Sequence, residues 1–209
     1  MNRNIKISLG VSATGLVGLM LLLIIGISTQ RTPQGAAPQR LDIGGDFALS
    51  DVTGQPVTQA DFAGRPMLIF FGFTYCPDVC PTTLDVLGRT LEALEKTAPQ
   101  VYEALQPVFI SVDPARDTPA QMADYLSYFH PKIIGLTGTA EQTAAVKKAY
   151  RVYAVKRPET DANGNYNVDH SSLLFLMDGD NRYLAHFDHS QGAAQLARRL
   201  ADKLAASEN

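Results

Sequence analysis

Residues 66–84 of this 209-residue chain read PMLIFFGFTYCPDVCPTTL. The segment 66–73 is almost wholly apolar, which is typical of a central strand buried on both faces of a sheet. It is followed by Cys76 and Cys80, the only cysteines in the sequence, each with a proline directly after it. Because proline is well tolerated at the first position of a helix, we expect a helix to begin near Pro81. The stretch therefore carries a cysteine pair from a buried strand to the start of a helix.

Strand patterns recur along the rest of the chain. Residues 47–58 predict a short hairpin that turns at Gly54, and residues 107–112, PVFISV, predict a second buried strand. Near the end of the chain, residues 172–177 and 183–187 flank the sequence DGDN, which is typical of a hairpin turn. A further short strand is expected between the two central helices that follow residues 107–112.

Capping signals mark the helices. Thr118 is a candidate N-cap followed by Pro119, and residues 139–142, TAEQ, form a capping box. Ser190 is expected to cap a final helix. The helix after the cysteines is supported by leucines at helical spacing, namely Leu84, Leu87, Leu91 and Leu94.

The order of these elements predicts the fold class. Strands that alternate with helices imply parallel pairing, and the terminal hairpin adds antiparallel strands. Among α/β folds, the thioredoxin-like fold typically places a cysteine pair where a buried strand leads into a helix. We therefore predict a thioredoxin-like fold in which helices flank a central mixed sheet.

The chain begins with a candidate membrane anchor, residues 1–28. Arg3 and Lys6 precede an uncharged, mostly apolar run over residues 7–28, and about 20 such residues span a bilayer as a helix. A cleaved signal peptide is the alternative, but its apolar region is usually only about 7–15 residues long and ends at a small-residue cleavage site. The leading positive charges favour a cytoplasmic N-terminus and a domain on the other side. Without a transit peptide, we expect the bacterial inner membrane, with the domain in the periplasm.

The remainder divides into a tether and a domain. Residues 29–41 are polar and rich in Gln, Pro and Ala, as in a flexible tether, and residues 42–209 are long enough to bury a sizeable core. The domain has 14 Lys and Arg against 21 Asp and Glu, a net charge of −7. This acidic balance argues against nucleic acid as a partner, since nucleic-acid binding needs a basic patch.

The spacing of Cys76 and Cys80 suits a metal and also permits a disulfide. Positions i and i+4 of a regular helix place Cβ atoms about 5–6 Å apart, whereas a disulfide needs about 3.5–4.5 Å. A direct bond therefore requires a distorted turn, while one metal ion can bridge more widely separated sulfurs. In an oxidising compartment both uses remain open.

His170 is the candidate third ligand. Two thiolates favour a soft metal such as Cu(I), and imidazole also suits copper. His170 directly precedes the predicted strand at 172–177. In thioredoxin-like folds the loop at this point faces the active-site cysteines, and oxidoreductases usually place a cis-proline there. This chain has no proline after Pro158 and presents Asp169-His170-Ser171 instead.

Three motifs in one order resemble those of the SCO/SenC family of copper-binding proteins. They are FTYCPDVCPTTL (73–84), ISVDPARDTP (110–119) and VDHSSLLFLMD (168–178), and the resemblance covers roughly residues 42–206. It implies a thioredoxin-like fold and a role in maturing the copper centre of cytochrome c oxidase. It also implies that Cys76, Cys80 and His170 bind copper, as Cu(I) or Cu(II). Asp113 matches an acidic residue that supports the family site.

Several neighbouring residues have plainer interpretations beside the functional ones. Asp113 precedes Pro114 and can simply shape a turn. Asp78 either stabilises the cysteine loop, contacts a partner or is a solvated surface carboxylate. Tyr75 and Phe73 are expected to pack around the site rather than to perform chemistry.

The histidines also have structural alternatives. His170 can cap a loop without binding a metal. His186 and His189 form an H-x-x-H pair, but they straddle a strand end and a helix cap, so we do not expect them to bind metal together. His130 precedes Pro131 at the end of a helix and is expected to be structural.

Two functions from different classes follow. The first is a tethered copper metallochaperone, with other copper chaperones and the copper-binding subunit of cytochrome c oxidase as partners and the membrane contacted through the N-terminal helix. The second is a thiol–disulfide oxidoreductase in which Cys76 and Cys80 exchange with a partner's disulfide and His170 tunes the thiolate. A thiol peroxidase is a third interpretation, but neither cysteine ends the Pro-x-x-x-Thr-x-x-Cys pattern of that group, because Phe73 and Pro77 occupy the threonine position.

Overall fold

The computed structural model describes residues 43–160 and 166–207. The predicted anchor (1–28) and tether (29–41) lie outside these described residues. Within the described ranges, no helix is both long enough and apolar enough to cross a membrane.

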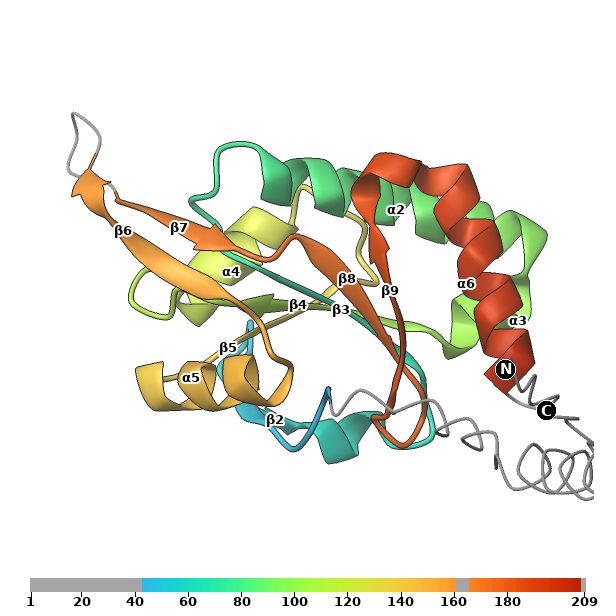
Figure 1. Ribbon diagram of the computed structural model, residues 1–209, viewed down its shortest axis with the longest axis horizontal. Coiled ribbons are helices and arrows are strands. Elements are labelled where there is room, and N and C mark those ends of the chain that lie inside the picture. Colours follow the sequence, from blue (N-terminus) through green and yellow to red (C-terminus); the bar gives the residue numbers. More distant parts are fainter. Residues whose placement is uncertain (1–42, 161–165, 208–209) are drawn as a thin grey trace, which may run out of the picture. The chain divides into compact units, whose positions relative to one another are not determined.

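A seven-stranded mixed sheet forms the centre of the described domain (Figure 1). Its order is β2-β1-β5-β4-β3-β8-β9. Strand β3 pairs in parallel with β4 and antiparallel with β8, so the predicted mixed sheet is confirmed. The strands are β1 (Ala48–Asp51), β2 (Pro56–Thr58), β3 (Met67–Gly72), β4 (Gln106–Ser111), β5 (Ile134–Thr137), β8 (Leu173–Met177) and β9 (Tyr183–Asp188).

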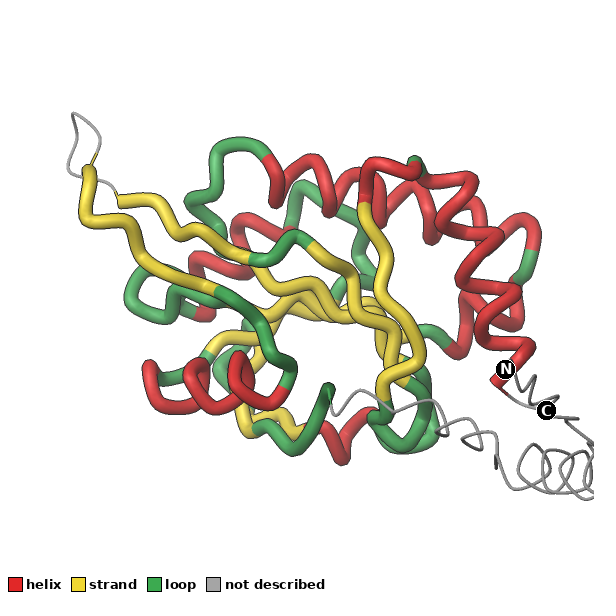
Figure 2. Tube along the Cα trace, viewed as in Figure 1, coloured by secondary structure: helices red, strands yellow, loops and turns green. Residues whose placement is uncertain are grey.

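Helices cover both faces of this sheet. Figure 2 shows the long helices α2 and α6 together on one side and α5 on the opposite side. Every residue of β3 and β4 is buried, as expected for strands covered on both faces. The helices are α2 (Val79–Thr97), α3 (Pro99–Ala104), α4 (Pro119–Leu126), α5 (Ala140–Ala149) and α6 (Ala193–Ser207), with short 3-10 helices η1 (Gln59–Phe62) and η2 (His189–Gln191).

A second, two-stranded sheet was not predicted. Strands β6 (Ala154–Thr160) and β7 (Tyr166–His170) pair with each other and with no strand of the main sheet. Figure 1 shows this hairpin extending away from the seven-stranded sheet. Its residues are mostly polar and partly exposed, so the hydrophobic alternation that marks a half-buried strand is weak here. The hairpin matters because His170 is its last residue.

Two of the predicted helix caps are confirmed. The Thr118 side chain accepts a hydrogen bond from the Gln121 N–H at 3.2 Å, directly before α4. Thr139 and Gln142 form the predicted reciprocal capping box at the start of α5, with bonds of 3.2 and 2.8 Å. Both follow from side chains that satisfy the free N–H groups of a first helical turn.

Of the two other predicted helix starts, one is confirmed and one is wrong. Helix α2 begins at Val79, two residues before Pro81, with Asp78 as N-cap, so the start expected near Pro81 is confirmed. Proline is tolerated slightly inside the helix because the first four N–H groups have no partner within the helix. Ser190 does not cap α6: it lies within η2, where its N–H donates to the Asp188 side chain, and α6 begins at Ala193.

The predicted turns agree with the backbone. Gly54 has a positive φ of 84° between β1 and β2, a conformation that glycine adopts without strain. In the DGDN turn between β8 and β9, Asn181 has φ 58°, and the Asp178 side chain accepts the Asp180 and Arg182 N–H groups. Both predicted hairpins are therefore confirmed.

Candidate metal centre

The two cysteines lie at the junction of β3 and α2. Cys76 is in the turn after β3, and Cys80 is the second residue of α2. The Cys80 N–H, one of the free donors of the first helical turn, points at the Cys76 Sγ at 3.4 Å. Cys76 is 8% exposed and Cys80 is fully buried, and both are free thiols. The start of α2 therefore presents a backbone N–H to the Cys76 sulfur.

His170 reaches this junction from the end of β7. Its Nε2 lies 3.4 Å from the Cys80 Sγ, and its Nδ1 lies 3.0 Å from the Ser171 carbonyl oxygen. A carbonyl oxygen only accepts, so Nδ1 carries the proton and donates it there. In the neutral ring the Nε2 lone pair then faces the sulfurs, which is the tautomer that a metal ligand requires.

Two phenylalanines hold the His170 ring in place. The Phe73 ring meets it edge-on with centroids 5.6 Å apart, and the Phe70 ring is tilted against it at 6.2 Å. Both phenylalanines are fully buried. The expectation that Phe73 packs around the site is confirmed.

These three side chains fit one metal ion. The donor atoms of Cys76, Cys80 and His170 all lie within 4.8 Å of one another. Two ligands on opposite sides of one ion, each about 2.3 Å away as for zinc and sulfur, are about 4.6 Å apart. Small side-chain rotations therefore bring all three donors around a common ion. Within residues 43–160 and 166–207, no other cluster of three such side chains meets this description.

The two thiols have opposite electrostatic environments. The hydrogen bond with Cys80 lowers the pKa of Cys76 well below its usual range, against an opposing effect of burial. Burial raises the pKa of Cys80 far above its usual range, and the hydrogen bond and charge of Cys76 raise it further. In the metal-free site, Cys76 is therefore the more acidic of the two thiols. A metal cation would favour the second deprotonation.

Gly72 makes room for the Cys80 sulfur. A Cβ at this position would lie 2.8 Å from the Cys80 Sγ and 2.7 Å from the Phe109 Cε2, both nearer than side-chain atoms normally approach. A glycine inside a buried strand often marks such a close approach. The glycine of the FFGF sequence is thus part of the site, although the sequence analysis assigned it no role.

Replacing Gly72 with alanine is expected to lower the free energy of unfolding by about 1–3 kcal/mol, the usual effect of overpacking a core. The added methyl group also crowds the Cys80 Sγ, one of the three candidate ligand atoms. Gly88→Ala in α2 is the matched control, because its nearest neighbour would be the His130 Cβ at an ordinary 3.4 Å. That change is expected to be neutral or stabilising. Urea unfolding of both variants tests the pair, and equal stabilities would contradict the crowding described here.

The other histidines do not join the site. The His186 Nδ1 is hydrogen-bonded to the Tyr183 hydroxyl, and the His189 Nδ1 lies 3.8 Å from the Asp188 carboxylate. Neither belongs to the metal-compatible cluster. His130 accepts a hydrogen bond from the Lys132 N–H through Nδ1, at 3.2 Å.

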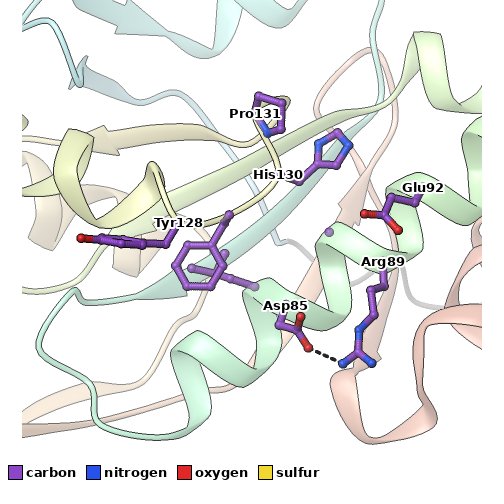
Figure 3. Close-up of a pocket in the computed structure, with 9 residues that line it drawn as sticks. Asp85, Arg89, Glu92, Tyr128, His130 and Pro131 are labelled. Atoms are coloured by element: carbon purple, nitrogen blue, oxygen red, sulfur yellow. Dashed lines mark hydrogen bonds and ion pairs between the residues drawn. The ribbon is translucent and has the colours of Figure 1, made fainter.

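His130 also lines a surface pocket of about 320 Å³ between α2 and residues 128–131. Figure 3 shows Asp85 and Arg89 on the α2 side of this pocket, joined by an ion pair. None of Cys76, Cys80 and His170 lines it. The pocket is therefore separate from the metal centre.

The candidate acidic residues occupy different places. Asp113 lies in the turn after β4, where its carboxylate accepts from Arg116 at 2.6 Å and from the Tyr166 hydroxyl at 2.7 Å. Asp78 is the exposed N-cap of α2, and its side chain makes no capping hydrogen bond. Tyr75 is 47% exposed and packs against the Arg116 guanidinium.

Asp117 is a supporting residue that the sequence analysis missed. Its carboxylate is fully buried and accepts from the Thr74 N–H, from the Thr74 hydroxyl at 2.7 Å and from the Ser111 hydroxyl at 2.6 Å. It thereby ties the cysteine turn to the end of β4. The available signal was its position in DPARDTP, directly before a helix cap, which by itself indicates only a turn.

The fold and site together define a thioredoxin-like α/β domain with a Cys-Cys-His metal-binding group. A family model described as SCO1/SenC matches residues 35–205. The chain is 43% identical over 162 residues to the mouse protein named Protein SCO2 homolog, mitochondrial, covering 78% of this chain and 62% of the mouse protein. It is 38% identical over 190 residues to a SCO2-like protein of Rickettsia felis, covering 88% and 89%. The chain therefore belongs to the SCO1/SenC family, and the resemblance noted in the sequence is confirmed.

A solved structure gives the same result. The structure described as Bradyrhizobium japonicum ScoI with copper bound is 44% identical in sequence, with a TM-score of 0.69. The match covers 77% of this chain and 99% of that one. The mouse relative is longer than the matched region, since the chain spans 62% of its length.

Proposed function

We propose that this protein is a copper metallochaperone, tethered to the membrane, that delivers copper to the copper-binding subunit of cytochrome c oxidase. The observation that carries the proposal is the convergence of the Cys76, Cys80 and His170 donor atoms within 4.8 Å. Copper is the cargo: the protein binds it and then transfers it to the acceptor.

The donor set favours copper over harder cations. Thiolates select soft ions such as Cu(I), and imidazole is acceptable to both Cu(I) and Cu(II). A relative with 44% identity is described as having copper bound, which supports the same ion here. The fixed tautomer of His170 leaves Nε2 as its ligand atom.

The burial of the ligands suggests how copper leaves. Cys80 is fully buried, whereas Cys76 is slightly exposed and His170 is partly exposed. An incoming ligand of the acceptor reaches copper first on the side of Cys76 and His170. Copper then passes by stepwise ligand exchange, without being released into water.

The proposed location follows from the N-terminal sequence. The apolar run at residues 7–28 would hold the protein in the bacterial inner membrane, with the N-terminus cytoplasmic and the domain periplasmic. Tethering confines the chaperone and the oxidase subunit to one membrane surface and raises their effective concentration. Other copper chaperones would supply the metal there.

His170→Ala in the full-length chain tests the three-ligand site. Since the imidazole supplies one of three donors, we expect Cu(I) affinity to fall by at least about tenfold, the lower end of the usual loss for a supporting residue. Competition against a Cu(I) chelator measures the affinity, with copper counted per chain. His186→Ala is the matched control. Because His186 lies outside the cluster, the Cu(I) affinity of this variant should equal that of the wild type. Equal affinity of the His170 and His186 variants would reject the proposed site.

Thiol–disulfide exchange is the second candidate function, favoured by the neighbouring free thiols. The Cys76 thiolate would attack a partner disulfide and form a mixed disulfide, releasing one partner thiolate. Cys80 would then displace the second partner sulfur and close a Cys76–Cys80 disulfide, so that two electrons reduce the partner. His170→Ala separates the functions: it should remove most copper delivery but leave most disulfide reduction intact.

A further inference from the structure

The candidate ligands come from two parts of the fold that no backbone ladder joins. Cys76 and Cys80 lie at the end of β3 in the main sheet, whereas His170 ends β7 in the two-stranded sheet. Figure 1 shows β6 and β7 running away from the main sheet. Ser171 and Ser172 connect His170 to β8, and side-chain contacts between the two parts are a second influence on the distance between the imidazole and the thiols.

Arg116, in the turn after β4, contacts both parts. Its Nη1 donates to the Tyr166 carbonyl oxygen at the start of β7, at 2.9 Å. Its guanidinium carbon lies 3.6 Å from the centre of the Tyr166 ring. On the side of the cysteine turn, the same carbon lies 4.7 Å from the Tyr75 ring centre and 5.7 Å from that of Phe73.

A buried ion pair fixes the orientation of this guanidinium. The Arg116 Nε donates to Asp113 at 2.6 Å, and the side chains of the two residues are only 15% and 7% exposed. The other oxygen of Asp113 accepts from the Tyr166 hydroxyl at 2.7 Å. One carboxylate therefore holds both the arginine and the hairpin tyrosine, and hydrogen bonds in such a buried network strengthen one another.

These contacts depend on the shape of arginine and not only on its charge. The planar fork directs Nε to Asp113 and Nη1 to Tyr166 while its face stacks on aromatic rings. The ammonium group of lysine is a point charge that cannot keep both directed bonds and the stacking.

We propose that Arg116 is a positioning residue for the metal centre: it holds the β6–β7 hairpin against the cysteine turn so that His170 meets the two thiols. The inference deepens the proposed function, because it assumes that Cys76, Cys80 and His170 bind one copper ion. Arg116 itself donates no ligand atom. Its effect on copper passes entirely through the placement of His170.

A double-mutant cycle in the full-length chain tests this role. Cu(I) affinity is measured for wild type, Arg116→Lys, His170→Ala and the double variant. We expect Arg116→Lys to weaken binding about tenfold, the lower end of the usual loss for residues that orient a ligand, and by no more than His170→Ala does. In the His170→Ala background the same change should have almost no further effect, because the ligand that Arg116 positions is already absent.

Arg157→Lys is the matched control on the same hairpin. Arg157 pairs with Asp169, and both side chains are substantially exposed, at 53% and 43%. Exposed pairs contribute little, so copper affinity should equal that of the wild type. Wild-type affinity in Arg116→Lys would overturn the proposal. An equal loss in both backgrounds would also overturn it, because it would indicate general loosening of the domain.

Amide hydrogen exchange of the metal-free chain supplies an independent readout. Arg116→Lys should speed exchange at Tyr166–His170 several-fold while leaving β3 and β4 unchanged. Unchanged exchange in the hairpin would overturn the positioning role whatever the copper result. If wild type instead binds no copper at the cluster, the proposed function fails, and faster hairpin exchange in Arg116→Lys would still support the structural link.

Discussion

Changing Cys80 to alanine is expected to lower Cu(I) affinity by at least about 100-fold, beyond the 10- to 100-fold loss typical of residues that only support a ligand. Cys80 is fully buried, and its Sγ lies 3.4 Å from the His170 Nε2 and within 4.8 Å of the Cys76 Sγ. Its removal leaves one thiolate and one imidazole, a two-donor site. Chelator competition with the full-length chain measures the loss.

The same variant changes the reactivity of Cys76 in the metal-free protein. The hydrogen bond with Cys80 is the largest cause of the lowered Cys76 pKa. Without it, the Cys76 pKa moves back toward the ordinary thiol value of about 8.5, so less thiolate is present near neutral pH. Alkylation of Cys76 by iodoacetamide at pH 6 should therefore slow, whereas the rates of wild type and variant should converge above pH 9.

His186→Ala again provides the control, since its copper affinity and its Cys76 alkylation rate should match those of the wild type. Tight copper binding by Cys80→Ala would contradict the three-donor site. An unchanged alkylation profile would show that some other group, and not Cys80, stabilises the Cys76 thiolate.

The central part of the fold was predictable because its signals are local. The uniformly apolar run before Cys76 required a buried strand, and the leucine spacing after Cys80 required a helix. These inferences need only the order of neighbouring residues.

The parts that were missed depend on contacts between distant segments. The polar β6–β7 hairpin is stabilised partly through Arg116 and Asp113, about fifty positions earlier in the chain. The sequence near Tyr166 contains no sign of these partners. Similarly, the need for glycine at position 72 arises from Cys80 and Phe109, which only the folded chain brings together. The Ser190 prediction failed because Asp188, two residues earlier, caps a separate short helix.

Replacing Asp117 with alanine is expected to lower the free energy of unfolding by about 2–4 kcal/mol at pH 4, since each buried donor left without an acceptor costs about 1–3 kcal/mol. The Thr74 N–H and hydroxyl and the Ser111 hydroxyl would all lose the Asp117 carboxyl oxygens as hydrogen-bond acceptors. Loss of the costly buried carboxyl offsets part of this destabilisation. Asp78→Ala is the matched control, because Asp78 is exposed and makes no capping bond; it should change stability by no more than about 0.5 kcal/mol.

The effect of Asp117→Ala should depend on pH. Burial raises the pKa of Asp117 in the folded protein. In the unfolded chain the pKa of an aspartate is about 3.9. Because the pKa of Asp117 is higher than this in the folded protein, its stabilising contribution is complete below about pH 3.9 and declines as the pH rises through the pKa of the folded state. The destabilisation caused by Asp117→Ala should therefore be larger near pH 4 than at pH 8. Urea unfolding at both pH values measures this difference, and a larger effect at pH 8 would show that the folded protein favours the Asp117 carboxylate, with its hydrogen bonds outweighing the penalty of burial.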